Sequence, residues 1–247
     1  MNAPGPDKAA AVRQLHAAAA HVRTLRAAAR GDAGLARDRL ALRAWQAERL
    51  ARTHRDLLAS PRYGPAAAFF LAELYGPQDQ GARDAAIERI LPTLARILPA
   101  PALETIALAL ELEALSEALD LALVRQLRSR ASRGALAITP ETYAVCYRAA
   151  SDRSARERQI ALVGRVGAAL NRLARKPLIA GALRIMAGPA RAAGLSALHA
   201  FLARGYAAFR HLRDADEFLA TIGAREQRIN DQLYAGAARP FAVDDGG

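Results

Sequence analysis

Residues 102–130, which read ALETIALALELEALSEALDLALVRQLRSR, form the longest uninterrupted helical pattern in the chain. Leucine, alanine, glutamate and arginine dominate the stretch, and these residues lose little side-chain freedom in a helix. Its large apolar residues recur at helical spacing, so we expect one buried face. The residues expected on that face are Ile106, Leu110, Leu115, Leu119 and Leu123. The stretch therefore predicts one long helix that contributes to a hydrophobic core.

The remainder of the chain has a similar composition. Alanine fills 62 of the 247 positions, and no segment alternates apolar and polar residues at the spacing of a strand. Glycine and proline separate the apolar stretches at short intervals. We predict an all-α protein, a single compact multi-helix bundle of about nine helices with short connections. We expect a disordered N-terminus over 1–6, a helical domain over 7–238 and a loose C-terminal tail over 239–247.

Local signals predict several helix boundaries. Residues 139–141, Thr-Pro-Glu, combine a capping residue, a proline at the first helical position and an acid in the first turn. A second helix is expected to continue to about residue 59, and another helix is expected over 79–98. A short helical segment should start at Pro177 and end near 188–189, where Gly-Pro follows.

Charge is distributed unevenly along the chain. The net charge is +11, carried by 33 arginines and 2 lysines against 24 acidic residues. Residues 1–60 carry +6, residues 61–120 carry −5, residues 121–200 carry +11 and residues 201–247 carry −1. This asymmetry indicates either a surface for phosphate-rich partners or pairing of acidic and basic segments within one fold.

The strongest signal of an interaction surface is a long stretch without acids. No aspartate or glutamate occurs over residues 158–213. Three of its arginines are seven residues apart, so they lie on one face of a helix and oppose an apolar face. A short apolar segment, 177–186, follows. The candidate binding residues of this basic surface are Arg158, Arg165, Arg172, Arg175, Lys176, Arg184 and Arg191.

The basic stretch is compatible with three interpretations. A basic amphipathic helix beside a short apolar segment is typical of proteins that lie on an anionic membrane. Alternatively, the helix belongs to the core and its arginines face water or pair with the carboxylates of 104–120. A nucleic acid also fits a basic stripe, but the stretch lacks interleaved aromatic residues for base stacking. We expect a non-catalytic interaction or scaffold protein that docks on an acidic partner or an anionic membrane.

Three carboxylates share one face of the long helix, because Glu113, Glu117 and Asp120 are spaced at i, i+4 and i+7. General acid–base catalysis would require two such groups in a partly desolvated cleft. The simpler interpretation is a solvated acidic face, or one that pairs with arginines from the basic segments. We favour that interpretation.

Aromatic residues concentrate at a helix junction, in the stretch Phe69–Asp79, although the protein is only 5% aromatic. These residues either belong to the core or line a pocket. A pocket near residues 63–84 would suit a small apolar ligand, such as an acyl chain or a flat cofactor, in a binding protein or an enzyme. The candidate pocket residues are Trp45, Tyr63, Phe69, Phe70, Tyr75, Asp79, Arg83 and Asp84.

Several classes of function lack their signatures. The sequence has no His-Glu-x-x-His, no Glu-x-x-His pair and no cysteine cluster, so we expect no metal and no cofactor. It has no Gly-x-Ser-x-Gly, Walker-type loop or Gly-x-Gly-x-x-Gly. The single cysteine, Cys146, is expected to be a packed thiol. No apolar stretch is long enough to span a membrane. We expect a cytoplasmic protein, peripheral at the inner membrane if it docks there.

Several short strings of the chain resemble those of a known family. The strings are Trp45-Gln46, Arg49-Leu50-Ala51, Phe69-Phe70-Leu71-x-x-Leu74-Tyr75-Gly76-Pro77-x-Asp79 and Arg83-Asp84. Through them, and through later strings such as Arg175-Lys176-Pro177-Leu178, the chain resembles an uncharacterised family of bacterial all-helical proteins. The resemblance covers roughly residues 40–230. It implies an all-helical domain of unknown function and supplies no catalytic residue.

Overall fold

A computed structural model describes residues 6–74, 91–131 except 94 and 97, 136–192 and 196–242. The described residues form helices and no strands, which confirms the all-α prediction. Most of the helix expected over 79–98 lies outside the described residues, as do Tyr75, Asp79, Arg83, Asp84 and the far ends of the predicted N-terminal and C-terminal segments.

The helices have the following bounds: α1 (Pro6–Arg30), α2 (Ala33–Thr53), α3 (Arg55–Ala59), α4 (Gly64–Leu74), α6 (Ala100–Arg130), α7 (Pro140–Ala150), α8 (Arg153–Ala174), α9 (Pro177–Ala192), α10 (Ser196–Leu212) and α11 (Asp216–Ala235).

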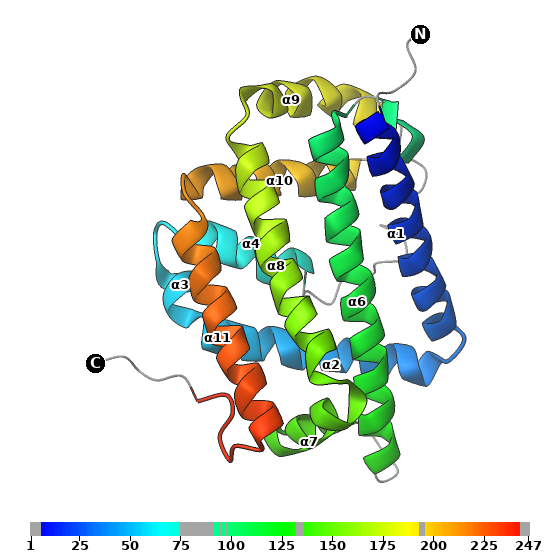
Figure 1. Ribbon diagram of the computed structural model, residues 1–247, viewed down its shortest axis with the longest axis vertical. Coiled ribbons are helices and arrows are strands. Elements are labelled where there is room, and N and C mark those ends of the chain that lie inside the picture. Colours follow the sequence, from blue (N-terminus) through cyan, green and yellow to red (C-terminus); the bar gives the residue numbers. More distant parts are fainter. Residues whose placement is uncertain are drawn as a thin grey trace.

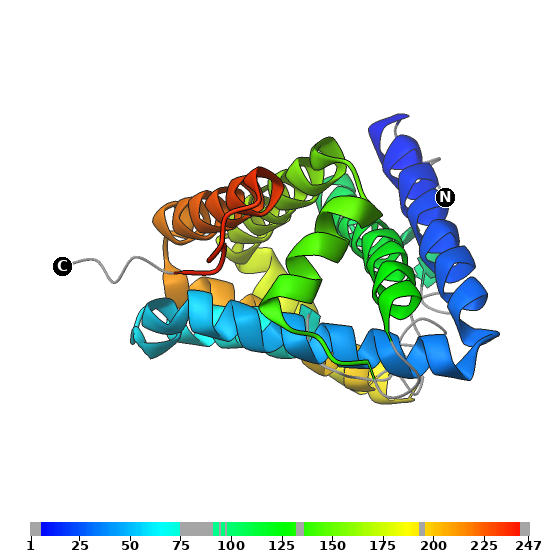
Figure 2. The same cartoon turned by 90° about the horizontal axis from the view of Figure 1, so that it is seen from below.

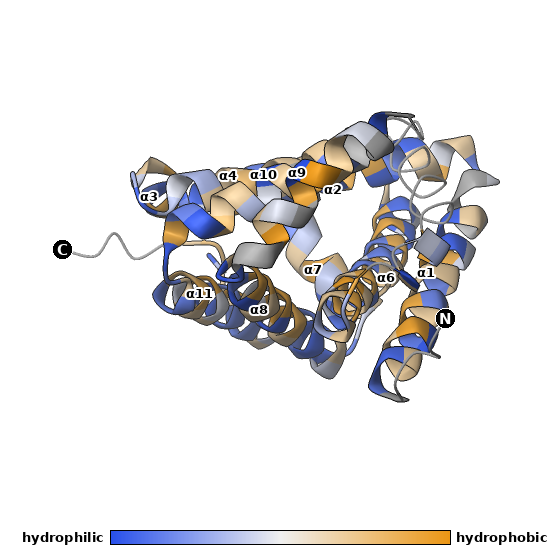
Figure 3. Cartoon of the chain, turned by 90° about the horizontal axis from the view of Figure 1, so that it is seen from above, coloured by the Kyte–Doolittle hydropathy of each residue, from blue (hydrophilic) through white to orange (hydrophobic). Residues whose placement is uncertain are grey.

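The helices pack in two layers (Figure 1). In the front layer α1 lies along α6, and α8 lies between α6 and α11. Behind them α2, α4 and α10 cross the long axis of the molecule, as the view from below also shows (Figure 2). Helix α7 covers one end of the molecule, and helix α9 covers the other end. The view from above, coloured by hydropathy, places α9 and α10 on one side of the molecule and α8 and α11 on the other (Figure 3).

Capping residues fix several helix starts. The Asp32 side chain accepts a hydrogen bond from the Leu35 backbone N–H at 2.9 Å, and Asp152 caps α8 in the same way. Thr139 and Thr142 exchange side-chain to backbone hydrogen bonds at the start of α7, as the Thr-Pro-Glu signal predicts for a helix start. These local interactions explain why the boundaries near 32, 140 and 152 follow from the sequence.

The second helix is shorter than expected. Its pattern predicts a helix to about residue 59, but α2 ends at Thr53 and α3 begins at Arg55. His54 separates them with φ −114° and ψ 26°, outside the helical region, and its ring lies 3.0 Å from the Glu226 carboxylate on α11. A contact between distant parts of the chain therefore accompanies a break that local sequence does not signal.

The helix that starts at Pro177 is longer than expected. Gly188 and Pro189 predict its end, yet α9 continues to Ala192. Pro189 has no N–H to donate to the carbonyl four residues before it, so α9 lacks one hydrogen bond there, but only three helical residues follow the proline. The helix therefore tolerates this proline.

The hydrophobic core has three parts. One joins α1 to α6 through residues such as Leu15 and Leu103, one joins α2, α6, α7 and α11, and one joins α3, α4, α8, α10 and α11. On α6, Leu110, Leu119 and Leu123 are buried, whereas Ile106 and Leu115 are half-buried; Cys146 on α7 is fully buried, as expected.

The start of the predicted C-terminal tail packs against the second part of the core. Pro240 is buried, and the Phe241 ring lies 5.6 Å from the ring of Trp45, centroid to centroid. Gly167 allows α8 and α11 to approach closely, because a Cβ there would collide with the Leu219 side chain.

Candidate functional site

The basic surface predicted from the sequence begins on α8. Arg158, Arg165 and Arg172 are exposed on the outer side of this helix, two turns apart. The inner side carries Leu162 and Val166, which are buried. The arginine face of α8 is therefore turned to solvent, and its residues are spaced about 10 Å apart along the axis.

The surface continues past the end of α8. Arg175 and Lys176 are exposed between α8 and α9, and Arg184 and Arg191 are exposed on α9. Because α9 lies across one end of the molecule (Figure 1), Arg175, Lys176, Arg184 and Arg191 lie toward that end, whereas Arg158 lies near the start of α8.

Two of the seven cations have an acidic partner. Arg158 Nη2 donates to Glu111 Oε1 at 2.7 Å, and Arg175 Nη2 lies 3.4 Å from Asp214 Oδ1. All four side chains are substantially exposed. Exposed ion pairs contribute at most about 1 kcal/mol, so these two hold their arginines only weakly.

The other five cations make no ion pair within the described part of the chain: they are Arg165, Arg172, Lys176, Arg184 and Arg191. We call these five residues the outer basic surface. The pairing that would have neutralised the basic stretch is therefore largely absent among the described residues.

An apolar side chain stands within this surface. Ile185 on α9 is 78% exposed, and it follows Arg184 directly. Two other large apolar residues are exposed in the described residues, Leu40 and Val145, on α2 and α7, at less than half of their area each. Among the side chains that the structure describes, this surface therefore has one protruding large apolar residue between its cations.

Two carboxylates of α6 pair with arginines of the first two helices instead of with the basic surface. Glu113 and Glu117 meet Arg26 of α1, whose Nη2 donates to Glu113 and whose Nε lies 3.6 Å from Glu117. Arg39 of α2 lies 3.0 Å from the other oxygen of Glu117. Arg26 and Glu117 are each only 4% exposed. We call this group, together with Asp120, the buried charge layer.

Asp120 completes the buried charge layer. It accepts a hydrogen bond from Gln46 Nε2 at 3.1 Å. Burial raises the pKa of Asp120, and the Gln46 hydrogen bond together with buried Arg156 and Arg43 opposes that rise. Burial likewise raises the pKa of Glu117, against the attraction of Arg39 and Arg26. The acidic face predicted from spacing is thus a packed interface between α6 and the first two helices.

This pairing explains where the excess charge of the protein lies. Among the described residues of the acidic segment 61–120, Glu113 and Glu117 pair with arginines of residues 1–60, and Glu111 pairs with Arg158 of the basic stretch. The segment 121–200, which carries +11, therefore keeps most of its charge at the surface.

A second buried ion pair joins α2 to α11. Arg49 Nη1 donates to both oxygens of Glu226, at 2.6 and 2.7 Å, and the His54 ring lies 3.0 Å from the same carboxylate. Burial alone would raise the pKa of Glu226, but Arg49 and His54 lower it to about 2. Glu226 is therefore an ionised structural anchor.

The predicted aromatic residues fall into two separate groups. Tyr63, Phe69 and Phe70 lie in the third part of the core, where the Phe70 ring packs 5.7 Å from that of Phe209. Trp45 lies in the second part, where its ring stacks on Tyr143 at 4.3 Å. The four other candidate pocket residues lie outside the described residues.

Contacts around the first aromatic group are close. A Cβ on Gly205 of α10 would lie 2.8 Å from Cζ of Phe69, so the Phe69 ring rests directly on that helix. The hydroxyl of Tyr63 donates to Glu217, at the start of α11. Within the described residues these side chains are occupied by contacts of the fold itself.

Several other kinds of site are not formed by the described residues. No group of three or more histidine, cysteine, aspartate and glutamate side chains gathers there in a way that would hold a metal ion. Over the same residues, no helix has the length and the apolar character needed to cross a bilayer.

Sequence reasoning did not single out Tyr206, Phe209, Arg210 and Arg213, which line a pocket on α10. The available signal was the acid-free stretch, since it extends to Arg213.

These features define an all-helical protein with a buried charge layer and an outer basic surface. The chain belongs to the family described as Domain of unknown function (DUF8198), whose family model matches residues 25–240. No curated protein and no solved structure matches the chain. The resemblance to an uncharacterised helical family is therefore confirmed.

Proposed function

We propose that this protein docks on an anionic membrane through the outer basic surface, without catalysis. The observation that carries the proposal is that Arg165, Arg172, Lys176, Arg184 and Arg191 are exposed and make no ion pair within the described residues. If the protein is cytoplasmic, the surface it meets is the inner face of the membrane, where anionic lipids attract basic segments.

The exposed side chain of Ile185 favours a membrane over an acidic protein. Protein–protein interfaces usually contain a buried apolar centre within a polar rim. Among the side chains that the structure describes on the outer basic surface, Ile185 is the one large apolar residue that protrudes, 78% exposed, and the other exposed large apolar residues of the described helices lie on α2 and α7. One apolar side chain between cations suits insertion at the level of lipid headgroups.

The expected affinity is modest. Each cation close to an anionic surface contributes about 1 kcal/mol, so five contribute about 5 kcal/mol. Partial burial of one isoleucine adds about 1 to 2 kcal/mol. The sum corresponds to a dissociation constant on the order of ten micromolar in accessible lipid. Binding should therefore be reversible and should weaken as salt screens the charges.

Flotation of the protein with vesicles tests the proposal. We expect recovery with vesicles that mix phosphatidylcholine and phosphatidylglycerol, little recovery with phosphatidylcholine alone, and weaker recovery for I185S with the mixed vesicles. Equal recovery with both vesicles would contradict the proposal. Tight, salt-sensitive binding to DNA or to an acidic protein, without binding to the mixed vesicles, would also contradict the proposal.

A further inference from the structure

A pocket of about 320 Å³ lies between the end of α8 and the second half of α10. Its lining comprises Ala174, Arg175, Tyr206, Phe209, Arg210 and Arg213. Ala174 and Phe209 are buried and supply the apolar part of the wall. Arg175, Arg210 and Arg213 are exposed and supply cations, and none of the lining residues is acidic.

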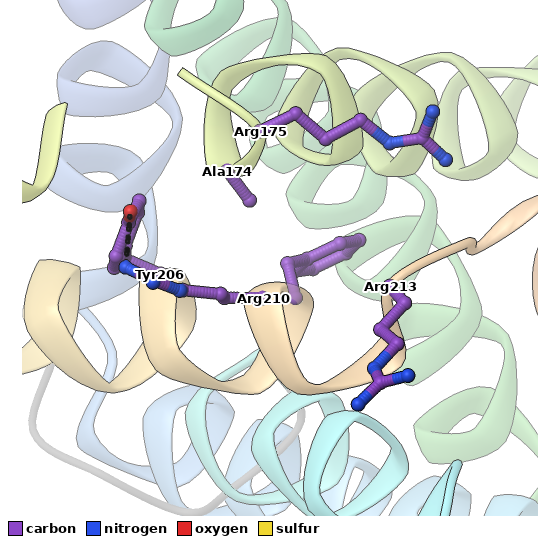
Figure 4. Close-up of a pocket in the computed structure, with 6 residues that line it drawn as sticks. Ala174, Arg175, Tyr206, Arg210 and Arg213 are labelled. Carbon is purple, nitrogen blue, oxygen red and sulfur yellow. Dashed lines mark hydrogen bonds between the residues drawn. The ribbon is translucent and has the colours of Figure 1, made fainter. Parts of the chain in front are cut away.

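The three arginines lie at different edges of the pocket, and their side chains extend in different directions (Figure 4). Arg175 extends from α8 on one side and Arg213 from the end of α10 on the other, while Arg210 points toward Tyr206 (Figure 4). Arg210 Nη1 donates to the Tyr206 hydroxyl at 3.3 Å, which holds this guanidinium on α10. Three arginines therefore border the pocket, and their guanidinium groups lie apart from one another (Figure 4).

Arg213 occupies a backbone conformation that an arginine rarely adopts. Its φ is +60°, directly after the last residue of α10. The corresponding position after α11 is Gly236, with φ +72°, where a glycine carries no penalty. At the end of α10 the chain keeps a charged side chain where glycine would relieve the strain. Strained backbone of this kind concentrates at binding sites.

Positive charge remains at the pocket after its surroundings are considered. The ends of α8 and α10 each carry a partial negative charge of about one half. Asp214 lies 3.4 Å from Arg175 and contributes a further negative charge. The three arginines carry three positive charges, and the two helix ends and Asp214 together supply about two negative charges. A net positive charge of about one therefore remains at the pocket.

We propose that this pocket binds a phosphate monoester. Guanidinium groups bind phosphate oxygens through paired hydrogen bonds, and a monoester offers three such oxygens. The apolar wall of Ala174 and Phe209 accepts the organic part of the ester, and the volume suits a small one. This inference goes beyond membrane docking and does not depend on it, since none of the five residues of the outer basic surface lines the pocket.

A phosphate monoester has two sources, a soluble metabolite or the headgroup of phosphatidic acid. The first arm of the test titrates glycerol 3-phosphate into the protein by calorimetry. The second compares flotation with vesicles that contain phosphatidic acid, a monoester, and with vesicles that contain phosphatidylglycerol, a diester. A preference for phosphatidic acid without binding of the soluble ester assigns the pocket to the lipid headgroup.

Three variants locate the binding. R210Q and R213G should each weaken binding at least about tenfold, because each removes a charged donor. R213G should not lower the melting temperature, since glycine suits the backbone there. R165Q, which removes an arginine of the outer basic surface outside the pocket, should bind the monoester as the unmodified chain does.

Equal binding by the unmodified chain, R210Q and R213G would overturn the proposal. Failure of glycerol 3-phosphate to bind, together with equal flotation on phosphatidic acid and phosphatidylglycerol, would also overturn it. Failure of membrane docking is recognised separately, because it abolishes flotation on both anionic lipids and leaves calorimetric binding of glycerol 3-phosphate unchanged.

Discussion

Arg39 of α2 lies 3.0 Å from Glu117 of α6, and Arg26 of α1 approaches the other oxygen of the same carboxylate. This shared carboxylate illustrates how acidic and basic side chains are distributed between the interior and the surface of the fold. The acids of the long central helix face inward and are neutralised by the first two helices. Arg165 and Arg172 of α8, and Arg184 and Arg191 of α9, face solvent without an ion pair among the described residues.

Replacement of Glu117 should destabilise the fold strongly. E117Q leaves Arg39 and Arg26 buried with less compensating charge, and loss of one partner from a buried pair costs about 3 kcal/mol or more. Urea denaturation measures this change. E104Q is the matched control, because Glu104 is exposed on the same helix and should alter stability by less than about 0.5 kcal/mol. Similar losses for both variants would refute the buried charge layer.

Acid should weaken the link between α2 and α11. Glu226 has a pKa of about 2 in the folded protein, below its ordinary 4.5. Its contribution to stability is therefore complete above pH 4.5 and is lost as the pH falls toward 2. The shift corresponds to about 3 kcal/mol.

Comparison with E226Q isolates that contribution, because the other acids titrate in both proteins. The difference in unfolding free energy between the two should shrink steadily from pH 4.5 to pH 2. A difference that stays constant over this interval would show that Glu226 is not held ionised by Arg49 and His54.

Two glycine substitutions test how tightly the aromatic group is packed. G205A places a methyl group 2.8 Å from the Phe69 ring and should cost about 1 to 3 kcal/mol. G164A meets nothing within 4 Å and should be neutral or stabilise by up to about 1 kcal/mol. Thermal denaturation compares them. A harmless G205A would indicate that Phe69 has free space beside it, as a pocket wall would.

The backbone at Arg213 gives a prediction about stability alone. R213G should be more stable than R213A by about 1 kcal/mol, because only glycine adopts φ +60° without strain. G236A, at φ +72°, should lose a comparable amount. Equal melting temperatures for R213G and R213A would mean that the position is unstrained in solution.

Much of the helical architecture follows from local sequence. Asp32, Thr139 and Asp152 act within three residues of their own position, so their caps are visible in a short window. The break at His54 is different. Its partner Glu226 is 172 residues away in the sequence, and no local pattern near His54 predicts the break.

The candidate site was predictable only in part. Helical spacing places Arg158, Arg165 and Arg172 on one face, because that follows from the geometry of a single helix. Pairing with the carboxylates of 104–120 was one interpretation of this face, but packing between helices decides which arginine pairs, and of the three only Arg158 does so among the described residues, with Glu111. The strained conformation of Arg213 likewise arises where α10 turns into α11, beyond the reach of composition or spacing.

The most direct test of the account compares two charge reversals of equal net charge. R165E/R184E/R191E alters the outer basic surface, and R125E/R130E/R239E alters exposed arginines near the opposite end of the molecule. Circular dichroism should first show that both variants are folded. We expect the first variant to lose flotation on vesicles containing phosphatidylglycerol and the second variant to retain most of it. Equal loss in both would show that only total charge matters, and would contradict a docking surface on α8 and α9.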